Sequence, residues 1–294
     1  MPARRTPPSR RALLGGLVFA LCAPLAAGAE TVLVGGDPNY PPFHYLNEEG
    51  QAEGRDIALI RAIAADQGFE VQFSLLEWGR VLGQLERGSV DVVPMFITED
   101  RRNRFDFSQP FARRHHQVFG PRGAARVEAI EDLAGQRVAV QFAGMAYEWL
   151  SNQDAAIDIR PINIEDSAVL AVARGDADYA LVPSDIGERA IALHRLDRIE
   201  ALSPPLLESD YAFGVSRLRP ALREKIDAGL ARLRANGELA RILALEVPGP
   251  VAVEQRQGPL AAGRRGSVSW WIMAFILLGL VFWVGARWAR TPEG

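Results

Sequence analysis

The chain has 294 residues, of which 48% are apolar and 23% charged, and its formal net charge is −3. This composition excludes a disordered or collagen-like chain, and the length allows one large domain or two modest ones. Residues 30–246 hold 24 basic and 34 acidic residues, so we exclude a nucleic-acid-binding surface, which requires a basic footprint. Cys22 is the single cysteine, which excludes a disulfide, a thiolate metal site or a cysteine nucleophile in residues 30–246.

Residues 1–29 have the pattern of a secretory signal peptide. Four arginines occur in the first 11 residues, residues 12–29 carry no charge, and residues 27–29 are small enough for a cleavage site. Arg10 and Arg11 leave twin-arginine export open beside the general secretory route. Leu21 is too bulky to favour a lipoprotein site at Cys22. We therefore expect the mature chain to begin at Glu30.

Predicted elements alternate along the body of the chain. Apolar and β-branched runs predict strands over 31–34, 71–75, 90–95, 136–142, 158–164 and 179–182. Helical spacing predicts helices over 57–64, 81–87, 147–152, 167–174 and 220–245, with a break at Asn236 and Gly237 in the last of these. Gly68, Gly88 and Gly175 are typical of helix ends. This alternation predicts a mainly parallel sheet with helices on its faces.

Residues after 246 change in character. Residues 247–266 are rich in Pro, Gly and Gln and predict a linker. Residues 267–286 are uncharged and apolar or small, with tryptophans near both ends, which is typical of a transmembrane helix. Residues 287–294 would then form a short cytoplasmic tail. The export signal places the body on the outer side of the membrane.

A series of short motifs follows in order between residues 30 and 246. In chain order they are 36–43 (GDPNYPPF), 54–57 (GRDI), Trp78 with Leu85 and 88–91 (GSVD), 98–101 (TEDR), 105–111 (FDFSQPF), 132–135 (DLAG) before Val138, and 175–178 (GDAD). Each is weak alone, but their order and spacing resemble the family 3 extracellular solute-binding proteins. The resemblance covers residues 30–246.

The resemblance implies an α/β fold of the bilobal type II periplasmic-binding-protein clamp, with two mixed sheets, flanking helices and two hinge strands. Lobe 1 would comprise residues 30–113 and 210–246, and lobe 2 residues 114–209. The hinge strands would lie near 116–119 and 212–215. A ligand would sit in the cleft and be enclosed as the lobes close.

The resemblance also implies a set of ligand-binding residues. Tyr40 and Trp78 would flank the ligand with their rings, and Thr98 would add a hydroxyl. Arg101 would bind a carboxylate, because a guanidinium fork matches that group in a partly dry cleft. Each has an ordinary alternative: core packing for the two aromatic residues and a solvated basic face for Arg101.

Other positions depart from the family's amino-acid-binding pattern. Phe96 stands where those members carry a small hydroxyl residue, and Met145 lies in a loop that lacks the usual hydroxyl. Pro183 replaces the acid that would hold an ammonium group, although Asp185 lies two residues on and could substitute. Asp37 is a further acidic candidate for the cleft. We therefore expect a small, partly apolar carboxylate ligand rather than an unmodified α-amino acid.

Three functions remain open. The first is a membrane-tethered binding protein on the periplasmic face of the inner membrane, delivering solute to a transporter permease. The alternative is a sensor module that signals through a membrane partner, and a less favoured third is a dehydratase-like enzyme. The chain lacks GxSxG, P-loop, HExxH and CxxC motifs. We expect a non-enzymatic protein without cofactor or metal.

Overall fold

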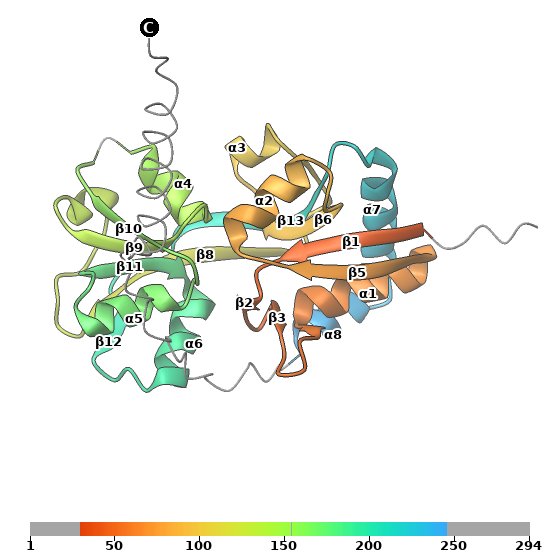
Figure 1. Ribbon diagram of the computed structural model, residues 1–294. Helices are drawn as coiled ribbons and strands as arrows, with labels where there is room; N and C mark the ends of the chain where they lie inside the picture. The colour runs from red at the N-terminus through yellow and green to blue at the C-terminus, as the bar shows by residue number, and fades with distance from the viewer. Residues whose placement is uncertain (1–29, 154, 246–294) are drawn as a thin grey trace, which may run out of the picture. The chain divides into compact units, whose positions relative to one another are not determined.

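One long sheet runs through the residues that the computed structural model describes, 30–153 and 155–245. Its strands follow the order β10-β9-β11-β8-β13-β6-β1-β5, with β12 beside β8 and β7 beside β13, and a small separate sheet has the order β2-β3-β4. The resemblance implied two mixed sheets; instead, hydrogen bonding continues from one lobe into the other. Figure 1 shows β8 and β13 passing between the two lobes and joining their strands.

The continuity comes from two ten-residue strands, β8 (Ala112–Pro121) and β13 (Leu206–Val215). At about 3.3 Å per residue each strand extends roughly 33 Å, which is long enough to reach from one lobe into the other. β13 pairs with β6 in lobe 1, where Tyr211 lies opposite Phe96. β8 pairs with β11 in lobe 2, where His116 lies opposite Pro183. These strands include the residues expected at the hinges.

Lobe 1 has a core on each face of its strands. Val32 and Val34 of β1 point to the side covered by α1, α7 and α8, whereas Leu33 points to the side covered by α2. This is the alternation of a strand buried on both faces. Its elements are β1 (Glu30–Gly36), β2 (Asn39–Tyr40), β3 (His44–Leu46), β4 (Ala52–Glu53), α1 (Arg55–Gln67), β5 (Phe69–Leu75), α2 (Trp78–Glu86), β6 (Val92–Phe96), α3 (Glu99–Arg102), β7 (Asp106–Phe107), α7 (Pro220–Ala235) and α8 (Glu238–Leu243).

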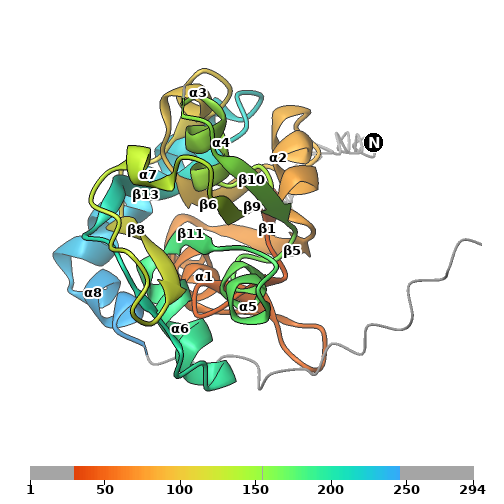
Figure 2. The same ribbon diagram turned by 90° about the vertical axis from the view of Figure 1, so that its left-hand side faces the viewer.

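Lobe 2 repeats this arrangement. Val138 and Val140 face a cluster that includes α4 residues, while Ala139 faces a cluster formed with α5 and α6. Figure 2 shows α5 and α6 on the opposite side of these strands from α4. The elements are a 3₁₀ helix η1 (Ile130–Leu133), β9 (Arg137–Gln141), α4 (Met145–Ser151), β10 (Asp158–Ile162), α5 (Ser167–Arg174), β11 (Tyr179–Pro183), α6 (Ser184–His194) and β12 (Ile199–Ala201).

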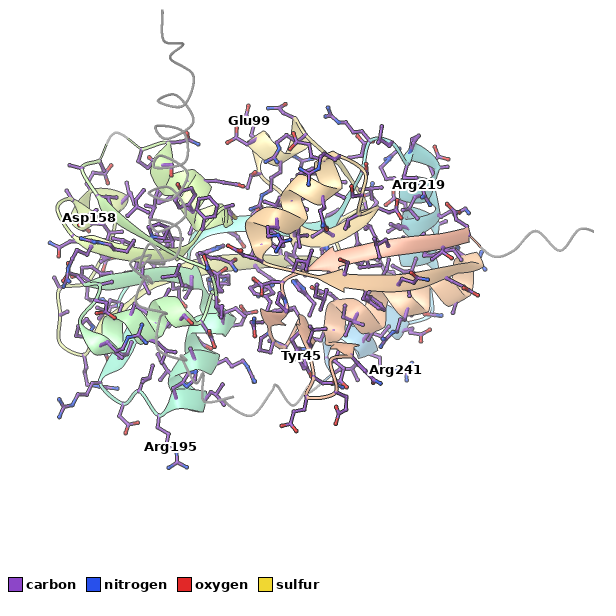
Figure 3. All side chains as sticks on the ribbon, in the orientation of Figure 1. Tyr45, Glu99, Asp158, Arg195, Arg219 and Arg241 are labelled. Atoms are coloured by element: carbon purple, nitrogen blue, oxygen red, sulfur yellow. The ribbon has the colours of Figure 1, made fainter. Side chains whose placement is uncertain are left out.

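Two helices end where glycines predicted it. Gly68 and Gly175 close α1 and α5 with φ of 72° and 79°, a left-handed conformation that glycine adopts without steric cost. The break expected near Asn236 separates α7 from α8. Helix α6 was not expected, since its sequence lacks a clear apolar repeat. In Figure 3, Asp158 and Arg195 mark the outer surface of lobe 2, and Arg219 and Arg241 that of lobe 1.

All described residues belong to one compact unit. The expected signal peptide, the linker 247–266, the span 267–286 and the tail 287–294 lie outside the described residues. Within 30–153 and 155–245, none of the helices combines the length and apolar character needed to cross a bilayer.

Candidate ligand-binding cleft

A small cavity lies between the lobes, with walls from both lobes and from the crossing strands. Its volume of about 30 Å³ is room for roughly two water molecules. The strand ends and helix starts of both lobes supply its lining, which includes Asp37, Tyr40, His44, Trp78, Phe96, Arg101, His116, Gln141, Met145, Glu165 and Tyr211. Of the candidates from sequence, Asp37, Tyr40, Trp78, Phe96, Arg101 and Met145 therefore meet here.

Arg101 is held rigidly at one side of this cavity. Thr98 caps the short helix α3, its hydroxyl oxygen accepting a hydrogen bond from the Arg101 backbone N–H at 3.1 Å. The Arg101 side chain is 1% exposed. Its Nη1 donates to the Phe96 carbonyl at 3.2 Å and its Nη2 to the Ala143 carbonyl at 3.1 Å. These bonds fix the orientation of the guanidinium, a planar group of N–H donors that suits a carboxylate.

One N–H of this guanidinium bonds to a carboxylate, which comes from the opposite lobe. The Arg101 Nε donates to a Glu148 oxygen on α4 at 3.1 Å. The Trp78 indole Nε1 donates to the Ala143 carbonyl of lobe 2 at 2.9 Å, and Gln141 Nε2 donates to Asp37 at 2.6 Å. These contacts hold the lobes together directly across the cleft.

A larger groove lies just outside the bridge between Arg101 and Glu148. Its volume is about 350 Å³, and Thr98, Glu99, Met145, Glu148 and other residues line it. Met145 borders both spaces, so this side chain and the bridge separate the groove from the inner cavity. A ligand pocket of ordinary size spans about 300–1,000 Å³. The groove alone lies within that range, and opening the bridge would join the inner cavity to it.

Aromatic rings form the inner wall. Tyr40 lies 5.4 Å from Phe43, and Phe96 lies 5.1 Å from Tyr211 and 4.9 Å from His116, measured between ring centroids. Burial raises the pKa of Tyr40 above its usual range, so its hydroxyl stays neutral. Burial lowers the pKa of His116 to about 3, so this imidazole is also neutral. The wall is therefore uncharged.

Three further polar side chains meet at the cavity. Asp37 follows β1 and is 3% exposed, and Glu165 follows β10 and is 6% exposed. Burial, and next the charge of Asp37, raise the pKa of Glu165 to about 8. Burial also raises the pKa of Asp37. His44 bonds through Nδ1 to Asp56 at 2.9 Å, while its buried Nε2 has no hydrogen-bond partner among the described residues.

Comparison with known proteins identifies the kind of cleft. The family model of bacterial extracellular solute-binding proteins, family 3, matches residues 32–244. The chain belongs to this family. The resemblance seen in the sequence motifs is confirmed, as is the bilobal α/β fold of an amino-acid-type solute-binding protein.

Individual proteins that resemble the chain are distant in sequence. The L-cystine-binding protein TcyJ of Escherichia coli is 24% identical over 253 residues, which cover 78% of this chain and 92% of the relative. A crystal structure of a histidine kinase sensor domain with similarity to periplasmic binding proteins is 30% identical, with a TM-score of 0.71, covering 76% of this chain and 99% of that domain. The arginine-bound form of truncated ArgBP from T. maritima is 27% identical, with a TM-score of 0.63, covering 69% and 96%.

Two candidates from sequence lie outside the inner cavity of this family 3 cleft. Thr98 lines the outer groove. Asp185, on α6, is 43% exposed and pairs with Arg114 at 2.6 Å. The Arg114 guanidinium in turn lies 3.5 Å from the centre of the Phe43 ring. The structure thus gives Asp185 a partner other than a ligand's ammonium group.

Sequence reasoning missed Glu148, Glu165 and His44. A signal for Glu165 exists: like Asp37 after β1, it follows the carboxyl end of a strand with a parallel neighbour, where open α/β sheets place their ligands. No cluster of three or more potential metal-ligating side chains occurs among residues 30–153 and 155–245.

Proposed function

We propose that the cleft binds a small solute through a carboxylate held by Arg101. The observation that carries this proposal is the Arg101–Glu148 bond: a buried, fixed guanidinium already meets a carboxylate oxygen at 3.1 Å. A ligand carboxylate would take the place of the Glu148 group. The inner cavity and outer groove would then join into one pocket, and the lobes would close again around the ligand.

Arg101 and Arg102 offer a matched pair for testing this proposal. Isothermal titration calorimetry of the full chain with L-arginine, L-cystine, L-alanine and propionate covers carboxylates with and without an amine. Replacing Arg101 by Met should weaken binding of any bound carboxylate about 100-fold, since a hydrogen-bonded charge pair is lost from a dry site. The exposed Arg102→Met change should leave affinity unaltered. Equal affinity of the Arg101 variant and the unchanged protein would refute the proposal.

We infer further that the protein works outside the cytoplasm as a tethered component of a transporter. Removal of residues 1–29 and anchoring by 267–286 would hold the binding unit at the periplasmic face of the inner membrane, beside a permease. Similarity to a putative amino-acid ABC transporter-binding protein of Vibrio harveyi supports the transport interpretation. Cell fractionation tests it: the chain should remain in the membrane after a salt wash and be accessible to protease from the periplasm.

Sensing is the second candidate, favoured by the 30% identity to a histidine kinase sensor domain, of which the match covers 99%. Ligand-driven closure would then be transmitted to a membrane partner. Deleting the gene separates the two possibilities. Loss of solute uptake supports transport, whereas unchanged uptake with a lost transcriptional response to the solute supports sensing.

A further inference from the structure

A short loop of lobe 2, residues 142–144, connects β9 to α4 and meets lobe 1 across the cleft. The Phe142 backbone N–H donates to the Ile162 carbonyl at 2.8 Å, which ties the start of the loop to the end of β10. The Gly144 N–H donates to the Gln141 carbonyl at 3.0 Å and closes a tight turn. Lobe 2 therefore fixes both ends of the loop.

The carbonyl group in the middle of this loop accepts two hydrogen bonds from lobe 1. The donors to the Ala143 oxygen are the Trp78 indole Nε1 at 2.9 Å and the Arg101 Nη2 at 3.1 Å. A carbonyl oxygen has two lone pairs, so both are used across the cleft. Trp78 and Arg101 are buried, and the guanidinium carbon lies 5.5 Å from the centre of the indole ring. The two donors are thus held side by side in a dry place, where such bonds are strong.

Ala143 also has a backbone conformation that alanine rarely adopts. Its φ is 57°, in the left-handed region, which is costly for a residue with a Cβ atom and is usually taken by glycine. Such a conformation persists only where the surrounding structure imposes it. The two bonds from lobe 1 supply part of that support, so the shape of the loop depends on the closed position of the lobes.

The Phe142 ring completes the contact. It is 45% exposed and lies against Gly79 on α2, where a Cβ atom would be 3.2 Å from the nearest ring carbon. The missing side chain at Gly79 therefore gives the ring its place on lobe 1. One turn further along α2, a Cβ atom on Gly83 would instead be nearest to the guanidinium of Arg87, which belongs to the same lobe.

We propose that residues 142–144, which we name the clasp, hold the lobes closed when no ligand is bound. The inner cavity of about 30 Å³ admits roughly two water molecules, so the clasp closes the lobes on each other and not on an organic acid. Closure is then the resting state, and a ligand enters only while the clasp is open. This inference goes beyond the proposed function, which concerns the group that Arg101 binds.

Distances between two spin labels report the position of the lobes without any ligand. Cysteines in place of the exposed residues Glu99 on α3 and Asp158 on β10 carry the labels on opposite lobes (Figure 3). The full chain also carries Cys22→Ser and is dialysed exhaustively before measurement. We expect one narrow distance. A broad distribution, or two populations of similar size, would overturn the clasp.

Two pairs of variants locate the effect. Trp78→Phe removes the indole donor but keeps a ring, and it should raise the ratio of open to closed protein about fivefold. Trp149→Phe is its control, because the Trp149 indole donates no hydrogen bond to lobe 1 among the described residues, and it should leave the ratio unchanged. Gly79→Leu places a side chain where the Phe142 ring lies and should open the lobes, whereas Gly83→Leu should not.

The double variant with Trp78→Phe and Gly79→Leu should be mostly open, with a longer distance between the labels. Circular dichroism checks that each variant is folded. Gly79→Leu removes no hydrogen bond, so it tests the clasp by itself if the variants at Trp78 do not fold. A label distance equal to that of the unchanged protein in these variants shows that the clasp is wrong.

The experiment contains no ligand, so its outcome is separate from that of the proposed function. Loss of the clasp would leave the carboxylate site at Arg101 standing. An absence of carboxylate binding would overturn that site and leave the clasp in place.

Discussion

Glu148 competes with the ligand for Arg101, so removing its charge should tighten carboxylate binding. The Arg101 side chain is 1% exposed and that of Glu148 19% exposed, and they meet at 3.1 Å. A hydrogen bond between charged groups contributes about 1.5–3 kcal/mol; the partial exposure of Glu148 places this bond at about 1.5–2 kcal/mol. The ligand must break this bond before it binds, so Glu148→Gln should lower Kd about 10- to 30-fold.

Calorimetry with the carboxylates used above measures this change directly. Glu99→Gln is the matched control, because Glu99 lines the same outer groove but makes no bond to Arg101. Figure 3 labels it on α3. Its removal should change Kd less than threefold, as expected for an exposed charge. Unchanged affinity of the Glu148→Gln protein for the same carboxylates would refute the competition. Weaker binding would refute it as well and would make Glu148 part of the ligand site.

Two further predictions concern stability. The pKa of Glu165 rises from 4.5 to about 8 on folding. The stability that Glu165 contributes is therefore full below pH 4.5 and is lost as pH rises through 8. Urea unfolding between pH 5 and 8 should show the free energy of unfolding falling by up to about 1.4 kcal/mol per pH unit. Glu165→Gln should flatten this profile, and an unchanged profile would contradict the burial argument. Asp185→Asn leaves the buried Arg114 without its carboxylate partner. This change should lower the free energy of unfolding by about 1.5–2 kcal/mol, after allowance for the exposure of Asp185. Asp176 forms a surface pair with Arg174, so Asp176→Asn should lower the free energy of unfolding by less than about 1 kcal/mol in the same urea titration. Equal losses in the two variants would contradict a larger contribution from the pair of Asp185 with the buried Arg114.

The local pattern of the sequence predicted the lobes' strands and most helices. Apolar runs identified the strands that are buried on both faces, and glycines with positive φ marked the ends of α1 and α5. The two crossing strands were harder to predict. Their full lengths depend on pairing with both lobes, which no local pattern encodes, and this pairing also joined the two expected sheets into one.

The site shows the same division between local and long-range information. The Thr98 cap and the spacing to Arg101 are local, so the motif could single out Arg101. Its partner Glu148 is 47 residues away, and their contact exists only because α3 and α4 meet across the cleft. Glu165 was missed for a related reason: an acid after a strand is ordinary in sequence, and its burial beside Asp37 becomes visible only when the lobes are brought together.

The most direct test of the account is a crystal structure of the full chain with L-alanine or another amino acid that calorimetry shows to bind. We expect the ligand carboxylate on Arg101, with Glu148 displaced and the lobes closed around the ligand. A ligand bound elsewhere, with the bond between Arg101 and Glu148 intact, would contradict both the carboxylate site and the exchange on which it depends.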